Sequence, residues 1–184
     1  ENKGDAWWLN QDGAGPYDDP ETLTLSDRCL ISFGSSSGPP MLPALYNNMK
    51  RIVQTPDYVV ILNEMVHDAR VIRLNSEHGD SSIRKWLGDS IGWWEGDTLV
   101  VDTVNFVSEF CHLICPQELS SDGGGEDLHV VERFTRTDEN TLLYSFTVED
   151  PNSWSEPWSG EYPWPKSKDR VFEYACHEGN YAME

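Results

Sequence analysis

The stretch GDSIGWWEGDTLVVDTVNF, residues 88–106, decides the fold class of this chain. Two runs rich in apolar and β-branched residues, 88–94 and 98–106, flank the tripeptide EGD at 95–97. Glycine and aspartate tolerate the backbone conformations of tight turns, so this arrangement is a strong signal for a β-hairpin. The stretch therefore predicts two antiparallel strands joined by a short turn.

The same pattern recurs along the chain from about residue 51 onward. Further strand-like runs alternate their side chains with a period of two and are bounded by turn-forming residues. They cover residues 57–66, 69–74, 128–136, 141–149 and 170–176. No segment shows a strong 3.6-residue period. We therefore predict an all-β fold, an antiparallel meander of about seven to nine strands. Because closure hides edge strands, the meander is expected to form a calycin-like barrel or a related sandwich.

Residues 1–50 differ from the rest of the chain. They are rich in glycine and proline, so regular structure is not expected there. Several of their residues are nevertheless too apolar for a solvated tail. These include Trp7, Trp8, Leu23 and Leu25. We predict a long irregular arm that packs either on its own β domain, residues 51–184, or on a neighbouring subunit, and the second alternative would give self-association through residues 1–28.

The charge of the chain restricts its partners. The 184 residues carry 13 Lys and Arg against 32 Asp and Glu, a formal net charge of -19. This field repels phosphate backbones and anionic lipid surfaces, so we expect no nucleic-acid partner. No apolar run approaches the length of a membrane helix, so we expect no membrane insertion. The length suits one domain with a sizeable core.

Four cysteines, Cys29, Cys111, Cys115 and Cys176, allow three pairings. The close spacing of Cys111 and Cys115 suits a local bridge, which leaves Cys29 to tie the N-terminal segment to Cys176. The alternative is a zinc site with the flanking His112, but one Cys-x3-Cys element without a second close pair is a weak zinc signal. We predict two disulfides, and hence a secreted or periplasmic protein.

Seven segments of the chain form a recognisable set: YDDPE at 17–21, DRC at 27–29, GPPM at 38–41, QTPDYVVI at 54–61, WEGDTLVVDT at 94–103, LHVVERF at 128–134 and YACHEGNY at 174–181. Together they resemble a group of bacterial exported proteins with no established activity. The resemblance runs from about residue 17 to 181. It implies export and one compact β-rich domain, and it carries over no catalytic roles. The Cys111 and Cys115 pair looks like a local departure from the group's pattern.

Histidines and glutamates at strand-like runs are the candidate site residues. Ionisable groups on sheet elements are costly unless they are paired, solvated or functional. The candidate catalytic residues are Glu64, His129 and His177, and the candidate ligand-binding residues beside them are His67, Glu132 and Glu178. The alternative interpretation is that strand-end ion pairs explain these residues. Those pairs would be Glu64 with Arg70 and Glu132 with Arg136.

A tryptophan-rich segment at 153–165 is the second candidate for ligand binding. It holds Trp154, Trp158 and Trp164 among prolines, which predicts a rigid loop that stacks on a sugar ring or aromatic ligand. The same loop could instead plug a barrel end or pack on a partner. No phosphate-binding or dinucleotide fingerprint occurs, so no cofactor is predicted. The histidine spacing does not predict a metal site, and the acidic loop at 122–127 lacks the EF-hand pattern.

Three hypotheses for function follow from these features. The first is the binding of a small ligand or glycan in a polar and aromatic pocket. The second is a self-assembling structural subunit whose N-terminal arm docks on the next copy, giving a fibre if the contact is head-to-tail. The third is a metal-free lyase or isomerase that uses histidine and glutamate for acid-base chemistry.

Overall fold

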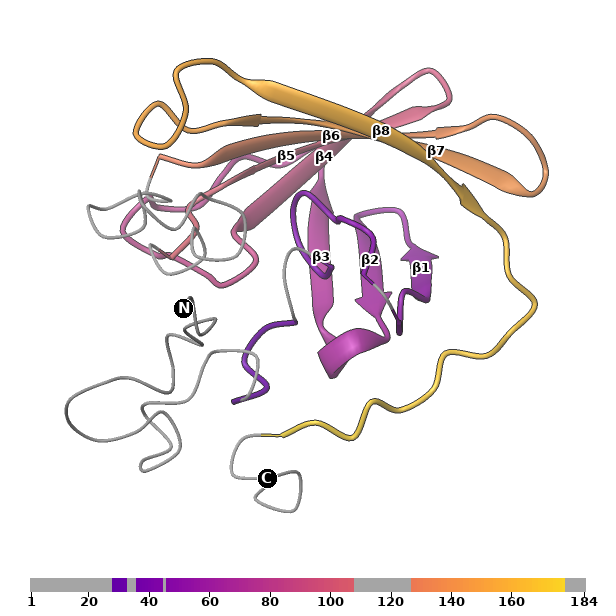
Figure 1. The fold of residues 1–184 in the computed structure, drawn as a ribbon. Coiled ribbons are helices and arrows are strands. Elements are labelled where there is room, and N and C mark those ends of the chain that lie inside the picture. The colour runs from indigo at the N-terminus through magenta and orange to yellow at the C-terminus, as the bar shows by residue number, and fades with distance from the viewer. Residues whose placement is uncertain (1–27, 33–35, 45, 108–126, 178–184) are drawn as a thin grey trace, which may run out of the picture.

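The fold is known from a computed structural model that describes residues 28–32, 36–44, 46–107 and 127–177. These residues form one eight-stranded sheet with the strand order β1 to β8, and a short 3-10 turn, η3 (Figure 1). The elements are β1 (Lys50–Gln54), β2 (Tyr58–Asn63), η3 (Met65–His67), β3 (Ala69–Leu74), β4 (Asp89–Glu95), β5 (Thr98–Val104), β6 (His129–Arg136), β7 (Thr141–Glu149) and β8 (Trp158–Pro165). The prediction of an all-β fold with about seven to nine strands is confirmed.

Both predicted hairpins are present. β4 and β5 pair across the EGD turn, where Gly96 has a φ of +60°, and β6 and β7 pair across residues 137–140. All neighbouring strands are antiparallel except β3 and β4, which are parallel, with Ile72 opposite Ser90. The predicted antiparallel meander is therefore interrupted at this pair. Its connection, residues 75–88, is a crossover that returns the chain to the same end of the sheet, as a parallel pair requires.

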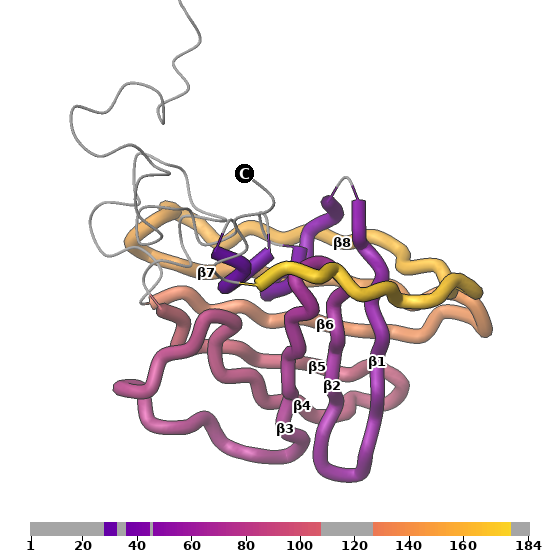
Figure 2. The backbone as a smooth tube through the Cα atoms, turned by 90° about the horizontal axis from the view of Figure 1, so that it is seen from below, coloured from indigo at the N-terminus to yellow at the C-terminus, as the bar shows by residue number. Residues whose placement is uncertain are grey.

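The sheet curls into a half-barrel. β4 to β8 form a broad layer, and β1 to β3 stand across it (Figure 1; Figure 2). In the described residues no ladder joins β1 to β8, so the predicted barrel shape is present but open between its first and last strands. The concave face carries the core. Its strand members are Val59, Ile61, Ile72, Leu99, Val101, Val130, Phe134, Tyr144, Phe146 and Val148.

Residues 36–44 cross the concave face and cover it. Met41 is fully buried, its backbone N–H donates to Tyr144 Oη at 2.8 Å, and its carbonyl accepts a hydrogen bond from Tyr162 Oη. Ile31, earlier in the chain, is also buried in the core. This described part of the predicted arm therefore packs on its own domain. Trp7, Trp8, Leu23 and Leu25 lie outside the described residues.

The C-terminal segment 166–177 forms an extended strap. The strand predicted at 170–176 is wrong, because this segment joins no ladder. The strap leaves the end of β8, passes β1 and runs beneath η3 (Figure 1; Figure 2). At its end Cys176 is bonded to Cys29, with 5.6 Å between their Cα atoms, which confirms this disulfide. The predicted Cys111–Cys115 bridge lies outside the described residues.

The tryptophan-rich segment forms a strand where a loop was predicted. Residues 158–165 make β8, which pairs with β7 from Val148↔Trp158 to Thr141↔Pro165. Pro163 and Pro165 are compatible with this strand because β8 lies at an edge of the described sheet, where a missing N–H costs no ladder bond. In the part of the chain that the structure describes, no helix is long and apolar enough to cross a membrane.

Candidate functional site

A buried polar network occupies the concave side of the half-barrel. Arg70 on β3 and Glu132 on β6 are 2% and 0% exposed. Both terminal nitrogens of the guanidinium donate hydrogen bonds to the carboxylate, Nη1 to Oε1 at 2.9 Å and Nη2 to Oε2. Tyr144 Oη donates to the same Oε1 at 2.7 Å. Arg70 also donates from Nε to Ser90 Oγ at 3.0 Å and from Nη2 to Thr103 Oγ1 at 2.8 Å. The charges are thus compensated inside the core.

This network replaces the alternative ion pairs that the sequence suggested. Arg70 pairs with Glu132 rather than with Glu64, because both side chains point inward across the curled sheet. Arg136 donates to backbone carbonyls of its own turn, at Asp138 and Glu139. Burial, and secondarily the charge of Glu132, raise the pKa of Tyr144 well above its ordinary value, so the phenol remains a hydrogen-bond donor. Glu132 therefore supports the core and has no contact with solvent.

The tryptophans proposed for ligand binding form an aromatic wall of the core. The ring of Trp164 stacks on Tyr144 with centroids 4.8 Å apart, and Trp158 meets Phe146 edge-on at 5.4 Å. Trp154 packs edge-on against Trp158 at 5.8 Å. These rings therefore fill the space in which a small barrel would hold a ligand.

Glu64, His67 and His177 lie away from His129. Glu64 is buried where β2 meets η3, and it accepts hydrogen bonds from Asn47 Nδ2 at 2.6 Å and from the backbone N–H of Phe172 at 3.1 Å. It thereby fastens the strap. His67 is exposed on η3, and His177 is exposed on the strap beside Cys176. Glu178 lies outside the described residues. The structure therefore does not bring the predicted catalytic side chains together.

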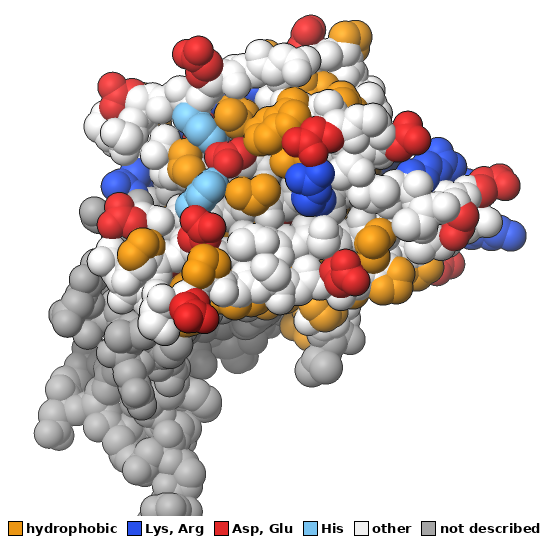
Figure 3. All heavy atoms as spheres, turned by 90° about the horizontal axis from the view of Figure 1, so that it is seen from above, with side chains coloured by type: hydrophobic (Ala, Val, Ile, Leu, Met, Phe, Trp, Pro, Cys, Tyr) orange, Lys and Arg blue, Asp and Glu red, His pale blue; other side chains and the backbone are white. Residues whose placement is uncertain are grey.

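His129 belongs instead to an array of histidines and carboxylates on the outer face of the broad layer. The two carboxylate oxygens of Asp102 on β5 each form a hydrogen bond with a histidine. One bonds to His78 Nε2 at 2.7 Å and the other to His129 Nε2 at 2.8 Å. The second ring nitrogens also face carboxylates: His129 Nδ1 lies 3.7 Å from Glu149, and His78 Nδ1 lies 3.3 Å from Asp89. Figure 3 looks onto this face, where two histidines lie among acidic side chains.

The carboxylates favour the charged state of this array. The hydrogen bond to Asp102 raises the pKa of His129 above its ordinary 6.5, against the opposing effect of burial. Burial raises the pKa of Asp102, but hydrogen bonds from His129 and His78 outweigh it and bring the pKa below 3.8. A general base needs a ring nitrogen free to accept a proton from a substrate. Because both nitrogens of His129 face carboxylates, the geometry supports charge pairing rather than base catalysis.

The array predicts a pH-dependent cost for the substitution Asp102→Asn. A histidine with a raised pKa stabilises the folded state fully below its unfolded pKa of about 6.5, and this contribution is lost as the pH rises through the folded value. The substitution should therefore lower the free energy of unfolding more at about pH 5.5 than at about pH 9. Urea unfolding at both pH values measures the difference, with Asp97→Asn in the exposed turn as control. An equal cost at both pH values would contradict the prediction.

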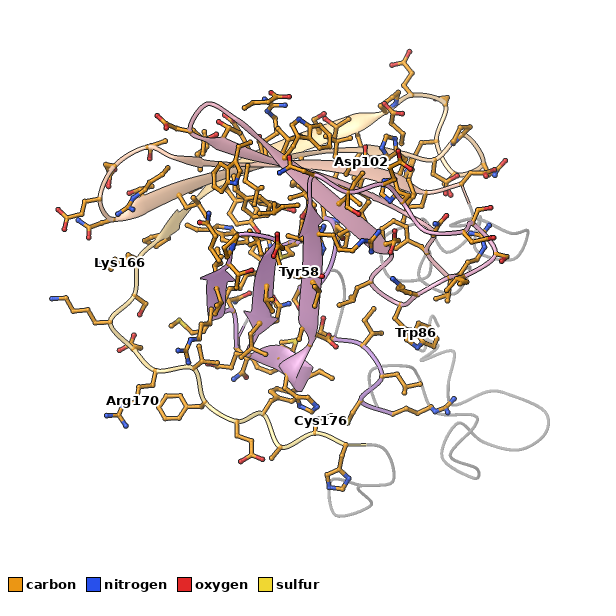
Figure 4. The ribbon with its side chains drawn as sticks, turned by 180° about the vertical axis from the view of Figure 1, so that it is seen from behind. Tyr58, Trp86, Asp102, Lys166, Arg170 and Cys176 are labelled. Carbon is orange, nitrogen blue, oxygen red and sulfur yellow. A yellow bond between two sulfur atoms is a disulfide. The ribbon has the colours of Figure 1, made fainter. Side chains whose placement is uncertain are left out.

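The unpaired edge of β1 is the second candidate site. In the described residues no strand pairs with its outer side, and its Ile52 and Val53 are 43% and 45% exposed. Phe172 on the neighbouring strap is 69% exposed. The strap also carries basic side chains, of which Figure 4 labels Lys166 and Arg170, in an otherwise acidic chain. Exposed apolar side chains therefore line a strand edge that could accept another strand, and the strap that passes this side of the sheet carries basic side chains.

Asp102 and His78 were not among the candidate site residues predicted from the sequence. Asp102 interrupts the apolar run of β5, a signal that was present in the sequence. His78 lies in the crossover loop, and its contact with Asp102 depends on the parallel β3–β4 pairing. In the described residues, no three or more His, Cys, Asp or Glu side chains are grouped so as to hold a metal ion. Comparison of the chain with protein-family models, with curated proteins and with solved structures found no match.

Proposed function

We propose that this protein is a self-assembling structural subunit, in which residues 1–27 of the N-terminal arm of one copy add as a strand to the free edge of β1 in the next. The observation that carries the proposal is the open half-barrel. Natural sheets protect their edges, because unpaired N–H and C=O groups next to apolar side chains recruit another strand. Strand addition supplies backbone hydrogen bonds for affinity, and alternate side chains for specificity.

Residues 1–27 have the composition that the β1 edge requires. They contain seven carboxylates and one lysine, a net charge of 1 - 7 = -6, and they include Trp7 and Trp8. The acceptor region offers exposed apolar side chains on β1 and the basic strap. The basic side chains of the strap are Lys166, Lys168 and Arg170. This complementarity opposes the repulsion between copies that each carry -19.

The positions of the donor and the acceptor favour an open assembly. The described base of the arm, residues 28–32, lies on the β3 side of the three-strand layer, where the N–H of Ser32 donates to Asp68 Oδ2 at 3.3 Å (Figure 1; Figure 2). The acceptor edge lies on the β1 side. A contact between two different surfaces of the same chain is heterologous, and repeated heterologous contacts generate rings or open fibres.

Deleting residues 1–27 should convert assemblies into monomers. Light scattering and negative-stain microscopy of the full chain should show particles far heavier than one subunit, and the deletion should abolish them. Ile52→Glu and Val53→Glu should do the same, because a carboxylate at the edge repels the acidic arm. The charge-matched control is Ile83→Glu. Ile83 is 61% exposed and lies in the connection between β3 and β4, outside β1. A 184-residue chain that stays monomeric at high concentration and moderate salt would refute the proposal.

Mixing two assembly-defective variants tests whether residues 1–27 of one chain bind the β1 edge of another. The deletion variant keeps the acceptor edge, and Ile52→Glu keeps the arm. Together they should form a one-to-one complex, because each supplies what the other lacks. A mixture that stays monomeric, although each variant keeps the melting temperature of the control, would mean that residues 1–27 do not bind the β1 edge.

A further inference from the structure

A shallow hollow of about 400 Å³ lies on the outer face of β6 to β8. The strand register places its lining side chains in two neighbouring rows. One row is Arg133, Ser145 and Glu161, and the next is Val131, Thr147 and Ser159. The hollow thus lies on the face that carries the histidine array, with Val131 two residues beyond His129 on the same side of β6. Its volume falls within the usual range for small-molecule sites.

The hollow combines a donor, an acceptor and hydroxyl groups in one row. The guanidinium of Arg133 only donates hydrogen bonds, the carboxylate of Glu161 only accepts them, and the hydroxyl of Ser145 between them can do both. In the second row Thr147 Oγ1 and Ser159 Oγ share a hydrogen bond of 2.8 Å. Val131, at the β6 end of the second row, provides an apolar surface beside the histidine array, since it lies opposite Asp102. A sugar ring presents the matching groups, which are adjacent hydroxyls around an apolar C–H face.

Arg133 on β6 is held in place from β4, which lies two strands away in the sheet. Its Nη2 pairs with Glu95 Oε2, and Glu95 Oε1 accepts a hydrogen bond from Trp93 Nε1 at 3.1 Å. The register puts Trp93, Val100 and Arg133 in line across β4, β5 and β6. A binding group oriented by its neighbours loses less freedom when a ligand arrives.

We propose that this hollow binds a neutral saccharide, with Arg133 and Glu161 on the ring hydroxyls and Val131 under the ring. The charges of the hollow and of the whole chain favour a neutral ligand. The positive and negative side chains of the hollow cancel, and the net charge of -19 disfavours an anionic sugar. The hollow lies on the outer face of β6 to β8, so the inference is independent of the assembly at the β1 edge.

Saturation-transfer NMR of the full chain with glucose, galactose, mannose and short oligomers of each tests the proposal. We expect saturable binding of at least one neutral sugar, in the millimolar range because the hollow is shallow. Glu161→Gln and Arg133→Lys should weaken it about tenfold, since the first replaces a charged acceptor by a neutral amide and the second removes the paired donors of the guanidinium. Glu139→Gln, in the exposed turn after β6, should leave binding unchanged.

Three outcomes would overturn the inference. One is the absence of saturable binding for every neutral sugar. Another is an equal loss of affinity for Glu161→Gln and Glu139→Gln, which would place the ligand elsewhere. The third is tighter binding of sulfated or carboxylated sugars than of neutral ones, because the charge argument would then fail. None of these outcomes affects the light-scattering result, so failure here and failure of the assembly proposal are distinguishable.

Discussion

Replacing Glu132 with glutamine should lower the free energy of unfolding by about 3–5 kcal/mol, because it leaves the charge of Arg70 buried without its counterion. Both partners are almost completely inaccessible to water, so no solvent replaces the lost interaction. The glutamine side chain has nearly the same shape as glutamate, so packing is preserved and the electrostatic loss is isolated. Urea unfolding followed by tryptophan fluorescence measures the change as a lower midpoint with an unchanged slope.

Two further variants separate the charge effect from a general sensitivity of this hairpin. Glu139→Gln makes the same chemical change at an exposed position in the β6–β7 turn and should change stability by less than about 0.5 kcal/mol. The double variant Arg70→Met, Glu132→Met should recover most of the loss, since removing both buried charges leaves neither unpaired. If Glu132→Gln costs no more than the exposed control, the network does not stabilise the core in the way inferred here.

Local sequence patterns predicted the strands that have local partners. The β4–β5 and β6–β7 hairpins follow from turn residues between alternating apolar runs, and both lie where they were predicted. The strands β1 and β8, at the open edges, were harder to predict. Pro163 and Pro165 made β8 look like a loop, because the sequence does not reveal that this strand needs no ladder bond on its outer side.

The strap shows the opposite error. Residues 170–176 have the composition of a strand, yet they pair with no other strand. A hydrogen bond to the side-chain carboxylate of Glu64 and the disulfide at Cys176 fix their position instead. Strand composition indicates that a segment can be extended, whereas pairing depends on which segment comes to lie beside it. The sequence contains no direct information on that neighbour.

The candidate site was harder to predict than the fold for the same reason. Glu132 was correctly singled out as an ionisable residue on a strand, but its partner Arg70 is 62 residues away in the sequence. His129 was singled out too, and its partner Asp102 becomes a neighbour only through the β5–β6 pairing. A single sequence identifies residues that need a partner. The curl of the sheet decides which partner each one meets.

Replacing Cys29 and Cys176 together with serine should lower the free energy of unfolding by about 4–5 kcal/mol on the chain-entropy model. The bridge closes a loop with a sequence separation of 147, and loop-closure entropy in the unfolded chain grows with that separation. The double variant avoids a lone thiol that could pair wrongly. Replacing Cys111 and Cys115 by serine is the matched control, and their predicted short loop should contribute only about 2 kcal/mol.

The disulfide should also matter for assembly, because it ties the base of the N-terminal arm to the end of the strap. Without it, residues 28–32 and the strap keep their separate contacts at Ile31, Ser32 and Phe172 but lose the covalent link between them, so the base of the arm is held less firmly. We therefore expect the Cys29 and Cys176 double variant to form shorter and fewer fibres even at temperatures where it remains folded, while the Cys111 and Cys115 variant assembles normally. Unfolding curves and electron micrographs of the two variants test both effects. Equal stability losses in the two variants would show that the long bridge does not restrain the unfolded chain as predicted, and normal fibres without it would show that the arm needs no anchor.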